Sequence, residues 1–390
     1  MPRRRSNVIR NLLLLVFLVV FLLMGVSPLI ESFLPINSKT GQWLEWSRSR
    51  VMEGMVAAWF FAFGSMVGSF INVVVWRMPR GVSVVSSGSA CPWCTNKIQL
   101  KDNIPIFGWL KLGGRCRVCR LPISPRYPIV EAIFGFVFLL LFFVELQSAC
   151  GNLPGGKRYV STGILQVILS TKWDVILTYV FHMLLVVMLL IWSLMAYDKS
   201  RLPVKTIVFA LLIGFGVSVG FPYVHPVIWN PGNQWFAELP WIERLATGFI
   251  GLACGFFLGS ILEVLLTESK GGKDTMRATS EGRGYPLTTS LMTIGLFLGW
   301  QASMWIVFFF GLLLFVFVVT KQMRLFSVSL PANGVLTLAA LVFLCTWVFI
   351  QPEQDQSSIV KNLLAALPGI ALVWIANGLW RTDEIKSETT

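Results

Sequence analysis

The sequence predicts an all-α polytopic membrane protein of about ten transmembrane helices, with a small cytoplasmic loop domain that carries four cysteines. The chain of 390 residues is 55% hydrophobic and only 13% charged, which is too apolar for a soluble protein of this length. Long apolar runs recur along it, and the basic residues gather in the short segments between them. Lys and Arg gather in this way in the cytoplasmic loops of membrane proteins. We therefore assign the formal charge of +13 to membrane orientation and membrane lipid, and expect no nucleic-acid partner.

The first apolar run, residues 12–30, follows four arginines within the first ten residues. Such a segment is either a retained membrane anchor or a cleaved signal peptide. No clear cleavage site of the small-x-small type follows the run. We therefore favour a retained anchor whose N-terminus lies in the cytoplasm. Residues 1–50 would then form the anchor and an external linker.

Nine further apolar runs follow at regular intervals. They cover residues 52–76, 128–146, 173–195, 203–222, 243–266, 286–300, 302–320, 334–350 and 362–380. The run 286–300 is the shortest, and a tilted or broken helix would also explain it. We divide this part into an N-terminal domain (51–135), a transmembrane helical domain (136–380) and a cytoplasmic tail (381–390).

If successive loops lie on alternate sides of the membrane, the basic loops fall on one side and the acidic loop falls on the other. The loops that would lie in the cytoplasm contain Lys199, Arg201, Lys205, Lys270, Lys273, Arg277, Arg283, Lys321 and Arg324. Glu353 and Asp355 would lie outside. The loop 77–126 has nine basic residues against the single acid Asp102, so it too is expected in the cytoplasm.

Two C-x-x-C pairs lie in this loop, CPWC at Cys91–Cys94 and CRVC at Cys116–Cys119. Each pair presents two thiolates from one tight turn, and two such turns can complete a tetrahedral zinc site. The 21 residues between the pairs leave room for a small subdomain. Two disulfides, or four cysteines without a ligand, are the alternatives. A disulfide framework needs an oxidising compartment, and the charge pattern favours the cytoplasm, so we expect zinc on Cys91, Cys94, Cys116 and Cys119.

Several motifs in the same order resemble one family. They are GSFINVVVWRMPRG (68–81), the two cysteine pairs, DNIPIFGWLKLGGRC (102–116) and LPISPRYPIVE (121–131). Together they resemble the N-terminal domain of the type IV prepilin leader peptidases, the bifunctional prepilin peptidase/N-methyltransferases. The resemblance implies a bacterial inner-membrane enzyme with a cytoplasmic zinc loop. It also implies cleavage of the leader of pilin-like precursors, and methylation of the new N-terminus with S-adenosylmethionine.

The resemblance further implies two aspartates at the membrane edge, one of which activates water while the other protonates the peptide carbonyl. The first place lies in LMAYDKSRLPV (194–204). Setting Leu202 and Pro203 on the family's Leu-Pro puts Ala196 at the aspartate's position. Asp198 remains nearby, and a turn shortened by two residues would bring it into place.

The second place lies in GRGYPLTTSLMTIGLFLGWQ (282–301), where Leu287 replaces the aspartate. Asp274 is the acid that we consider as a substitute, although it lies 13 residues upstream in a polar segment that a flexible turn would also explain. Glu263 lies near the cytoplasmic end of an apolar run, where a carboxylate needs a partner or water. It is a functional candidate, but the simpler interpretation is that it reaches the membrane interface beside Glu268 and Lys270.

Two classes of function follow from these observations. In the first, the protein matures pilin-like precursors, through Asp198 and Asp274 as displaced catalytic acids or through methyl transfer alone. In the second, it is a proteolytically inactive family member that binds pilin-like precursors or assembly proteins in the membrane.

Overall fold

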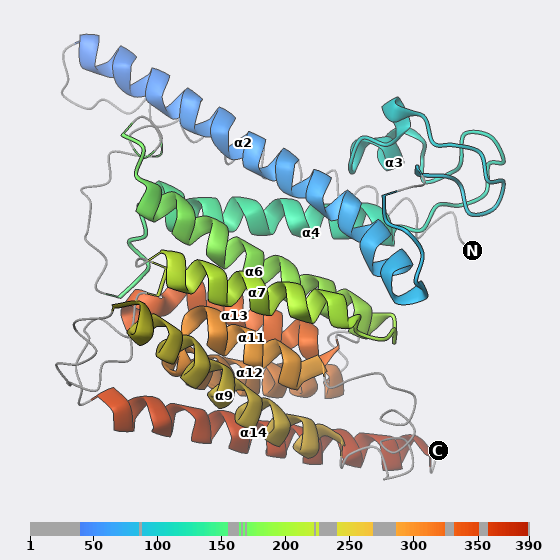
Figure 1. Cartoon of the computed structure of the whole chain (residues 1–390). Coiled ribbons are helices and arrows are strands. Elements are labelled where there is room, and N and C mark those ends of the chain that lie inside the picture. The colour runs from blue at the N-terminus through green and yellow to red at the C-terminus, as the bar shows by residue number, and fades with distance from the viewer. Residues whose placement is uncertain are drawn as a thin grey trace. The chain divides into compact units, whose positions relative to one another are not determined.

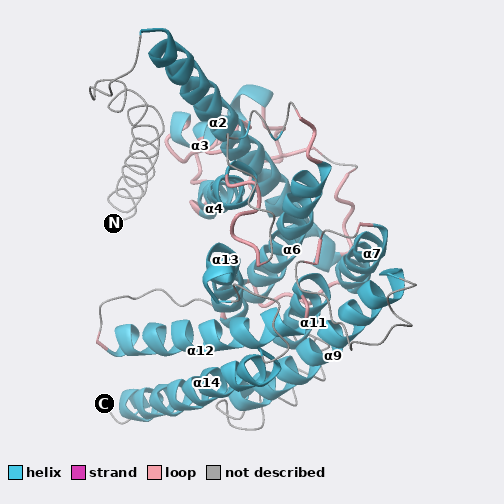
Figure 2. Cartoon of the chain, turned by 90° about the vertical axis from the view of Figure 1, so that its left-hand side faces the viewer, coloured by secondary structure: helices cyan, strands magenta, loops and turns pink. Residues whose placement is uncertain are grey.

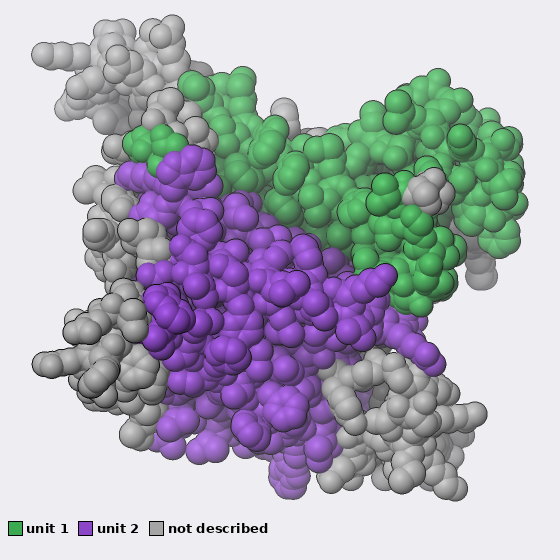
Figure 3. Space-filling model, in the orientation of Figure 1, with its two compact units in different colours: residues 1–147, 161–171 green, residues 148–160, 172–390 purple. Residues whose placement is uncertain are grey.

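The structure is a computed structural model, and it describes residues 40–85, 88–154, 164, 167, 170–221, 224–225, 240–267, 286–323, 331–350 and 358–388. Within these residues every element is helical, apart from two isolated β-bridges (Figure 2). The chain forms two compact units (Figure 3). Unit 1 comprises residues 1–147 and 161–171, and unit 2 comprises 148–160 and 172–390.

Nine of the expected apolar spans are helices in the described residues. Seven of them are long and apolar enough to cross a membrane, and Val204–Gly220 and Pro286–Leu298 are shorter. The expected first span, 12–30, lies outside the described residues. The domain limits expected from the sequence stay a prediction, while the contacts divide the units after Gln147.

Unit 1 is a pair of long helices with a loop domain at one end (Figure 1). Helix α2 (Thr40–Arg77) packs against α4 (Arg126–Leu141), which a π-helical turn, η3 (Phe142–Gln147), extends. Glycines of α2 make the close approach possible, since a Cβ on Gly64 would lie 2.7 Å from the Phe134 carbonyl oxygen. A Cβ on Gly68 would lie 2.9 Å from the Cα atom of Glu131. Small residues commonly allow such contacts between helices in lipid.

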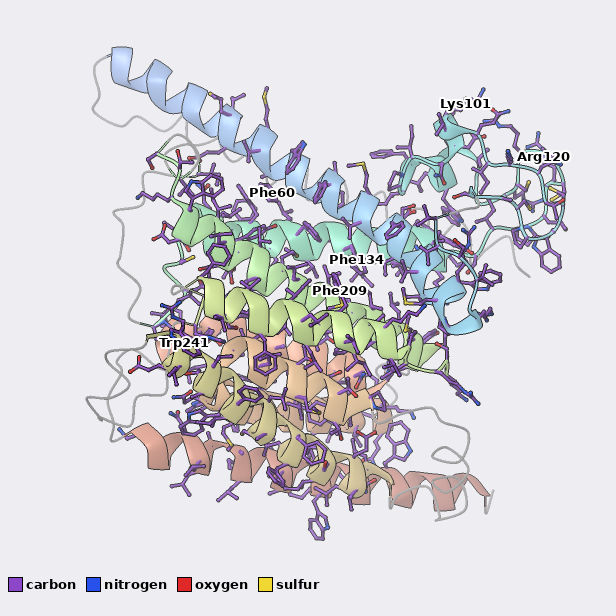
Figure 4. All side chains as sticks on the ribbon, viewed as in Figure 1. Phe60, Lys101, Arg120, Phe134, Phe209 and Trp241 are labelled. Carbon is purple, nitrogen blue, oxygen red and sulfur yellow. The ribbon has the colours of Figure 1, made fainter. Side chains whose placement is uncertain are left out.

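Three short helices lie in the described residues of the loop domain between α2 and α4. They are η1 (Met78–Arg80), η2 (Leu100–Asp102) and α3 (Phe107–Lys111). Lys101 and Arg120, both exposed, lie on its outer side (Figure 4). Trp109 is the aromatic centre of this small domain, because it is only 7% exposed and its Nε1 donates to the Ile123 carbonyl oxygen at 3.1 Å.

The described residues of unit 2 form a bundle of seven helices. They are α6 (Trp173–Tyr197), α7 (Val204–Gly220), α9 (Pro240–Thr267), α11 (Pro286–Leu298), α12 (Trp300–Gln322), α13 (Ala332–Ile350) and α14 (Ser358–Glu388). Helices α9 and α11 are in particularly close contact, because Gly251, Gly255 and Gly259 recur every four residues on one face of α9. A Cβ on Gly255 would lie 2.0 Å from the Leu291 carbonyl oxygen.

The shortest expected span, 286–300, is a short helix in the structure and ends just before the next one begins. Helix α11 ends at Leu298, and α12 begins at Trp300. Gly299 between them has a φ of +88°, a conformation that glycine adopts without the penalty of a Cβ. The 13 residues of α11 rise about 20 Å, less than the roughly 30 Å of a bilayer core. The expected span 286–300 is therefore a short, unbroken helix, and the alternative of a tilted helix stays a prediction.

Candidate functional site

The four cysteines of the loop domain come together at one point. The sulfur atoms of Cys91, Cys94, Cys116 and Cys119 all lie within 4.8 Å of one another. The Cys91 and Cys119 sulfurs are 3.8 Å apart, and those of Cys94 and Cys116 are 3.9 Å apart. These distances are too long for a disulfide, whose sulfurs are about 2.05 Å apart. The cysteines are free thiols in an arrangement that could hold a metal ion.

Each C-x-x-C pair forms a knuckle with the same backbone hydrogen bonds. In the first, the Thr95 N–H donates to the Cys91 carbonyl oxygen at 2.9 Å. In the second, the Arg120 N–H donates to the Cys116 carbonyl oxygen at 3.1 Å. Thr95 and Arg120 both have positive φ, +56° and +59°. The two knuckles are therefore local structures of one kind, and each aims its pair of sulfurs inward.

The pKa of the Cys116 thiol is lowered to about 6. The main cause is the backbone N–H of Cys119, which points to the Cys116 sulfur, and the N–H of Val118 adds to it. The N–H of Asn96 likewise lowers the pKa of Cys94. The Leu121 N–H lowers the pKa of Cys119, but burial and the neighbouring thiols outweigh it and raise that pKa to about 11. Four adjacent sulfurs thus do not all ionise unless a cation neutralises them, and this is the electrostatic character of a thiolate metal site.

An ion pair connects the segment between the two cysteine knuckles to the second knuckle. Arg117 donates to both carboxylate oxygens of Asp102, the single acid of the loop. These hydrogen bonds and the positive charge lower the pKa of Asp102. The pair thus holds the helical turn that ends at Asp102 against the cysteine cluster.

Glu131 of α4 joins the loop domain to the membrane helices. Its Oε2 accepts the N–H of Ile106 at 2.6 Å, and the side chain is 8% exposed. Ile106 has a φ of +62°, which is strained for a β-branched residue. The role of Glu131 was not predicted from the sequence. A carboxylate within an apolar run needs a partner, and this signal could have identified it.

The acids expected from the sequence lie in different parts of the chain. Asp198 directly follows the end of α6 and is exposed. Ala196 lies in the last turn of α6, and Leu287 lies in the first turn of α11, where it is 4% exposed. Asp274 lies outside the described residues. The structure therefore leaves the pairing of Asp198 with Asp274 untested.

Glu263 approaches the beginning of α11 from the neighbouring helix α9. Its Oε2 accepts the N–H of Thr288 at 3.1 Å and the Thr288 hydroxyl at 3.3 Å. The N–H of Leu287 also points to this carboxylate. Glu263 therefore caps a helix of its own bundle, while its expected position at the membrane interface stays a prediction.

The N-terminal part of the chain matches the family model described as the Bacterial Peptidase A24 N-terminal domain, over residues 62–144. A prepilin leader peptidase/N-methyltransferase of Myxococcus xanthus is 45% identical over 93 residues, which cover 24% of this chain and 27% of that protein. A type 4 prepilin-like proteins leader peptide-processing enzyme of Escherichia coli is 39% identical over 103 residues, 22% of this chain and 38% of that protein. The chain thus spans less than half of the length of these two relatives.

A longer similarity reaches a prepilin leader peptidase/N-methyltransferase of Aeromonas hydrophila. It is 30% identical over 266 residues, which cover 62% of this chain and 73% of that protein. No solved structure matches the chain. The extent of the Aeromonas hydrophila match shows that this chain belongs to the prepilin leader peptidase/N-methyltransferase family.

Proposed function

We propose that the protein processes pilin-like precursors in the membrane, by removing their leader and methylating the new N-terminus. The similarity to the Aeromonas hydrophila protein carries this proposal, because it covers 62% of the chain. The matched part of the chain is longer than unit 1, so the similarity extends into unit 2. Both the loop domain and part of the helical bundle therefore support it.

We propose zinc as the ion of the cysteine cluster. With Zn–S bonds of about 2.3 Å, a tetrahedron places its sulfurs about 3.8 Å apart. The pairs at 3.8 and 3.9 Å fit this geometry. Four thiolates fill a tetrahedral shell and leave no position for a reacting water, so the ion would hold the loop in shape rather than act on the substrate.

For leader removal we propose Asp198 as one acid, and the sequence offers Asp274 as its partner. A carboxylate pair hydrolyses an amide when one member takes a proton from water while the other gives a proton to the carbonyl oxygen. For methylation we propose S-adenosylmethionine as the methyl donor. Support for this donor comes from the family, and none of the described residues is assigned to it.

We place the protein in the bacterial inner membrane with its cysteine loop in the cytoplasm. In unit 2, Asn377 of α14 donates to the Leu265 carbonyl oxygen at the end of α9, at 2.6 Å. Gln322 at the end of α12 donates to the Leu379 carbonyl oxygen at 2.8 Å. Three helices thus end on the same side, where Lys321 lies. Lys321 at these ends agrees with a cytoplasmic assignment, since cytoplasmic loops are rich in basic residues.

A proteolytically inactive protein that binds pilin-like precursors or assembly proteins is the second candidate. The observation that favours it is Leu287, since a buried apolar side chain at the family's aspartate position cannot transfer a proton.

Co-expression with a pilin-like precursor from the same genome distinguishes precursor processing from binding without proteolysis. Mass spectrometry of the precursor's N-terminus should show leader removal and N-methylation, and both should be absent from cells without the chain. Asp198→Asn should stop leader removal. An intact precursor that co-purifies with the wild-type protein would support the binding function instead.

A further inference from the structure

The carboxylate of Glu263 lies close to Leu287, the residue that replaces the family's second aspartate. The N–H groups of Leu287 and Thr288 both point to it, and its Oε2 is 3.1 Å from the Thr288 nitrogen. Gly259, one turn earlier on α9, makes this contact possible, since a Cβ there would lie 2.5 Å from the Thr288 Cα atom. The carboxylate is thus held by the backbone of α11 rather than by a flexible partner.

A buried polar network connects this end of α11 to the end of α6. The Ser193 hydroxyl of α6 donates to the Asn333 carbonyl oxygen at 3.0 Å. The side-chain amide of Asn333 donates to the Pro286 carbonyl oxygen of α11 at 3.3 Å. Ser193 lies five residues before Asp198, about 7.5 Å of helix rise. The end of α6, the beginning of α13, the beginning of α11 and Glu263 therefore lie at one end of unit 2.

Few acids with described side chains lie at that end. Unit 2 has four acids with described side chains: Asp174, Asp198, Glu243 and Glu263. Asp174 and Glu243 lie in the first turns of α6 and α9, at the opposite ends of these helices (Figure 1). Asp198 and Glu263 therefore form the one pair of such acids that shares an end with the beginning of α11.

We propose that Glu263 supplies the second carboxylate of the proteolytic site, as the partner of Asp198. This inference rests on the proposed precursor cleavage. One carboxylate takes a proton from water while the water oxygen bonds to the amide carbon, and the protonated partner gives its proton to the carbonyl oxygen. The C–N bond then breaks as the newly protonated carboxyl group gives its proton to the leaving nitrogen, and a hydroxyl on the carbon returns a proton to the other carboxylate. The products are a carboxyl group and a free amine, and the acid pair again shares one proton.

Asn333 gives this place a further polar group. Its Oδ1 has no hydrogen-bond partner among the described residues, and the residue is 2% exposed. An unsatisfied buried acceptor costs free energy, so the bundle keeps this polar group beside the beginning of α11 at the expense of some stability. This site would take an extended segment of a pilin-like precursor at the membrane edge.

The test compares Glu263→Gln with wild type and with Glu243→Gln, a matched change at the other end of α9. Glutamine keeps an oxygen for the Thr288 N–H but transfers no proton. Leader removal is measured with the purified full-length protein and a purified precursor, and N-methylation with a pilin that already lacks its leader. We expect Glu263→Gln to slow leader removal about 100-fold or more. Its methylation rate and melting temperature, and every activity of Glu243→Gln, should match wild type.

Each other outcome has a distinct meaning. If Glu263→Gln removes the leader at the wild-type rate, the inference is wrong while the proposed function stands. If Glu263→Gln lowers cleavage, methylation and the melting temperature together, Glu263 is only a structural cap. If Asp274→Asn abolishes cleavage and Glu263→Gln does not, Asp274 is the second acid. If wild type removes no leader, the proposed cleavage itself fails.

Discussion

Arg117 holds Asp102 through two hydrogen bonds, from Nε to Oδ2 at 2.6 Å and from Nη2 to Oδ1 at 2.5 Å. The Asp102 side chain is 3% exposed, whereas that of Arg117 is 40% exposed. A fork of this kind combines charge with fixed geometry. It therefore sets the position of the turn Leu100–Asp102 relative to the second cysteine knuckle.

Asp102→Asn should make the loop domain less stable at pH 7, seen as faster metal loss to a chelator. The pKa of Asp102 is lowered by Arg117, so the stabilisation is complete above the ordinary Asp pKa of about 4. It is lost as the pH falls through the lowered pKa, because the unfolded chain binds the proton more readily. Wild type and variant should therefore converge in acid. A difference that persists unchanged once Asp102 is protonated in the folded protein would contradict this.

Cys91→Ser should reduce the bound zinc of the purified protein from about one ion per chain to little or none. Three remaining thiolates leave the tetrahedral shell incomplete, and the loop has little apolar core to replace the metal. Elemental analysis measures the ion, and alkylation measures the accessible thiols. Cys150→Ser is the control, since Cys150 lies outside the cluster. Wild-type protein without metal, and with all four thiols readily alkylated, would exclude a zinc site.

Glu131→Ala should loosen the loop domain from the membrane helices. It removes the acceptor of the Ile106 N–H, and a buried donor without a partner costs about 1–3 kcal/mol. Limited proteolysis should cut the loop faster than in wild type. Glu131→Gln keeps an acceptor oxygen and should behave much more like wild type. Equal proteolysis of the two variants would show that the hydrogen bond is not what holds the loop.

Gly255→Ala should separate α9 from α11, because the added Cβ would lie 2.0 Å from the Leu291 carbonyl oxygen. Overpacking of this kind costs about 1–3 kcal/mol of unfolding free energy. Gly216→Ala on α7 is the matched control, since a Cβ there meets nothing within 4 Å. It should be neutral or slightly stabilising, because alanine favours a helix. Unfolding in detergent measures both, and equal stabilities would contradict the packing argument.

A reporter inserted near residue 100 should be active on the cytoplasmic side. The prediction rests on the nine basic residues of the loop 77–126, which disfavour its transfer across the membrane. A reporter at residue 353, beside Glu353, should be active on the opposite side. If the first reporter works only in the periplasm, the assignment of sides is wrong.

The sequence by itself determined the helices and the cysteine cluster. The length and apolarity of the runs decide which segments can cross a bilayer, since backbone groups in lipid must be satisfied within a helix. The C-x-x-C spacing determines that the two sulfurs of each pair point to the same place, because two residues between the cysteines are enough to turn the backbone. These features depend on neighbours in the chain, so the pattern of residues was sufficient to predict them.

Only the tertiary structure decided which polar groups meet across the helices. Glu263 and Thr288 are 25 residues apart, as are Ile106 and Glu131. From the sequence, the simpler interpretation of Glu263 was a position at the membrane interface, and Thr288 was not named as its partner. Its actual partner depends on how closely α9 approaches α11 and on the rotation of each helix about its axis. Both are set by the glycine contacts between the helices, and no local pattern specifies which helices will share them.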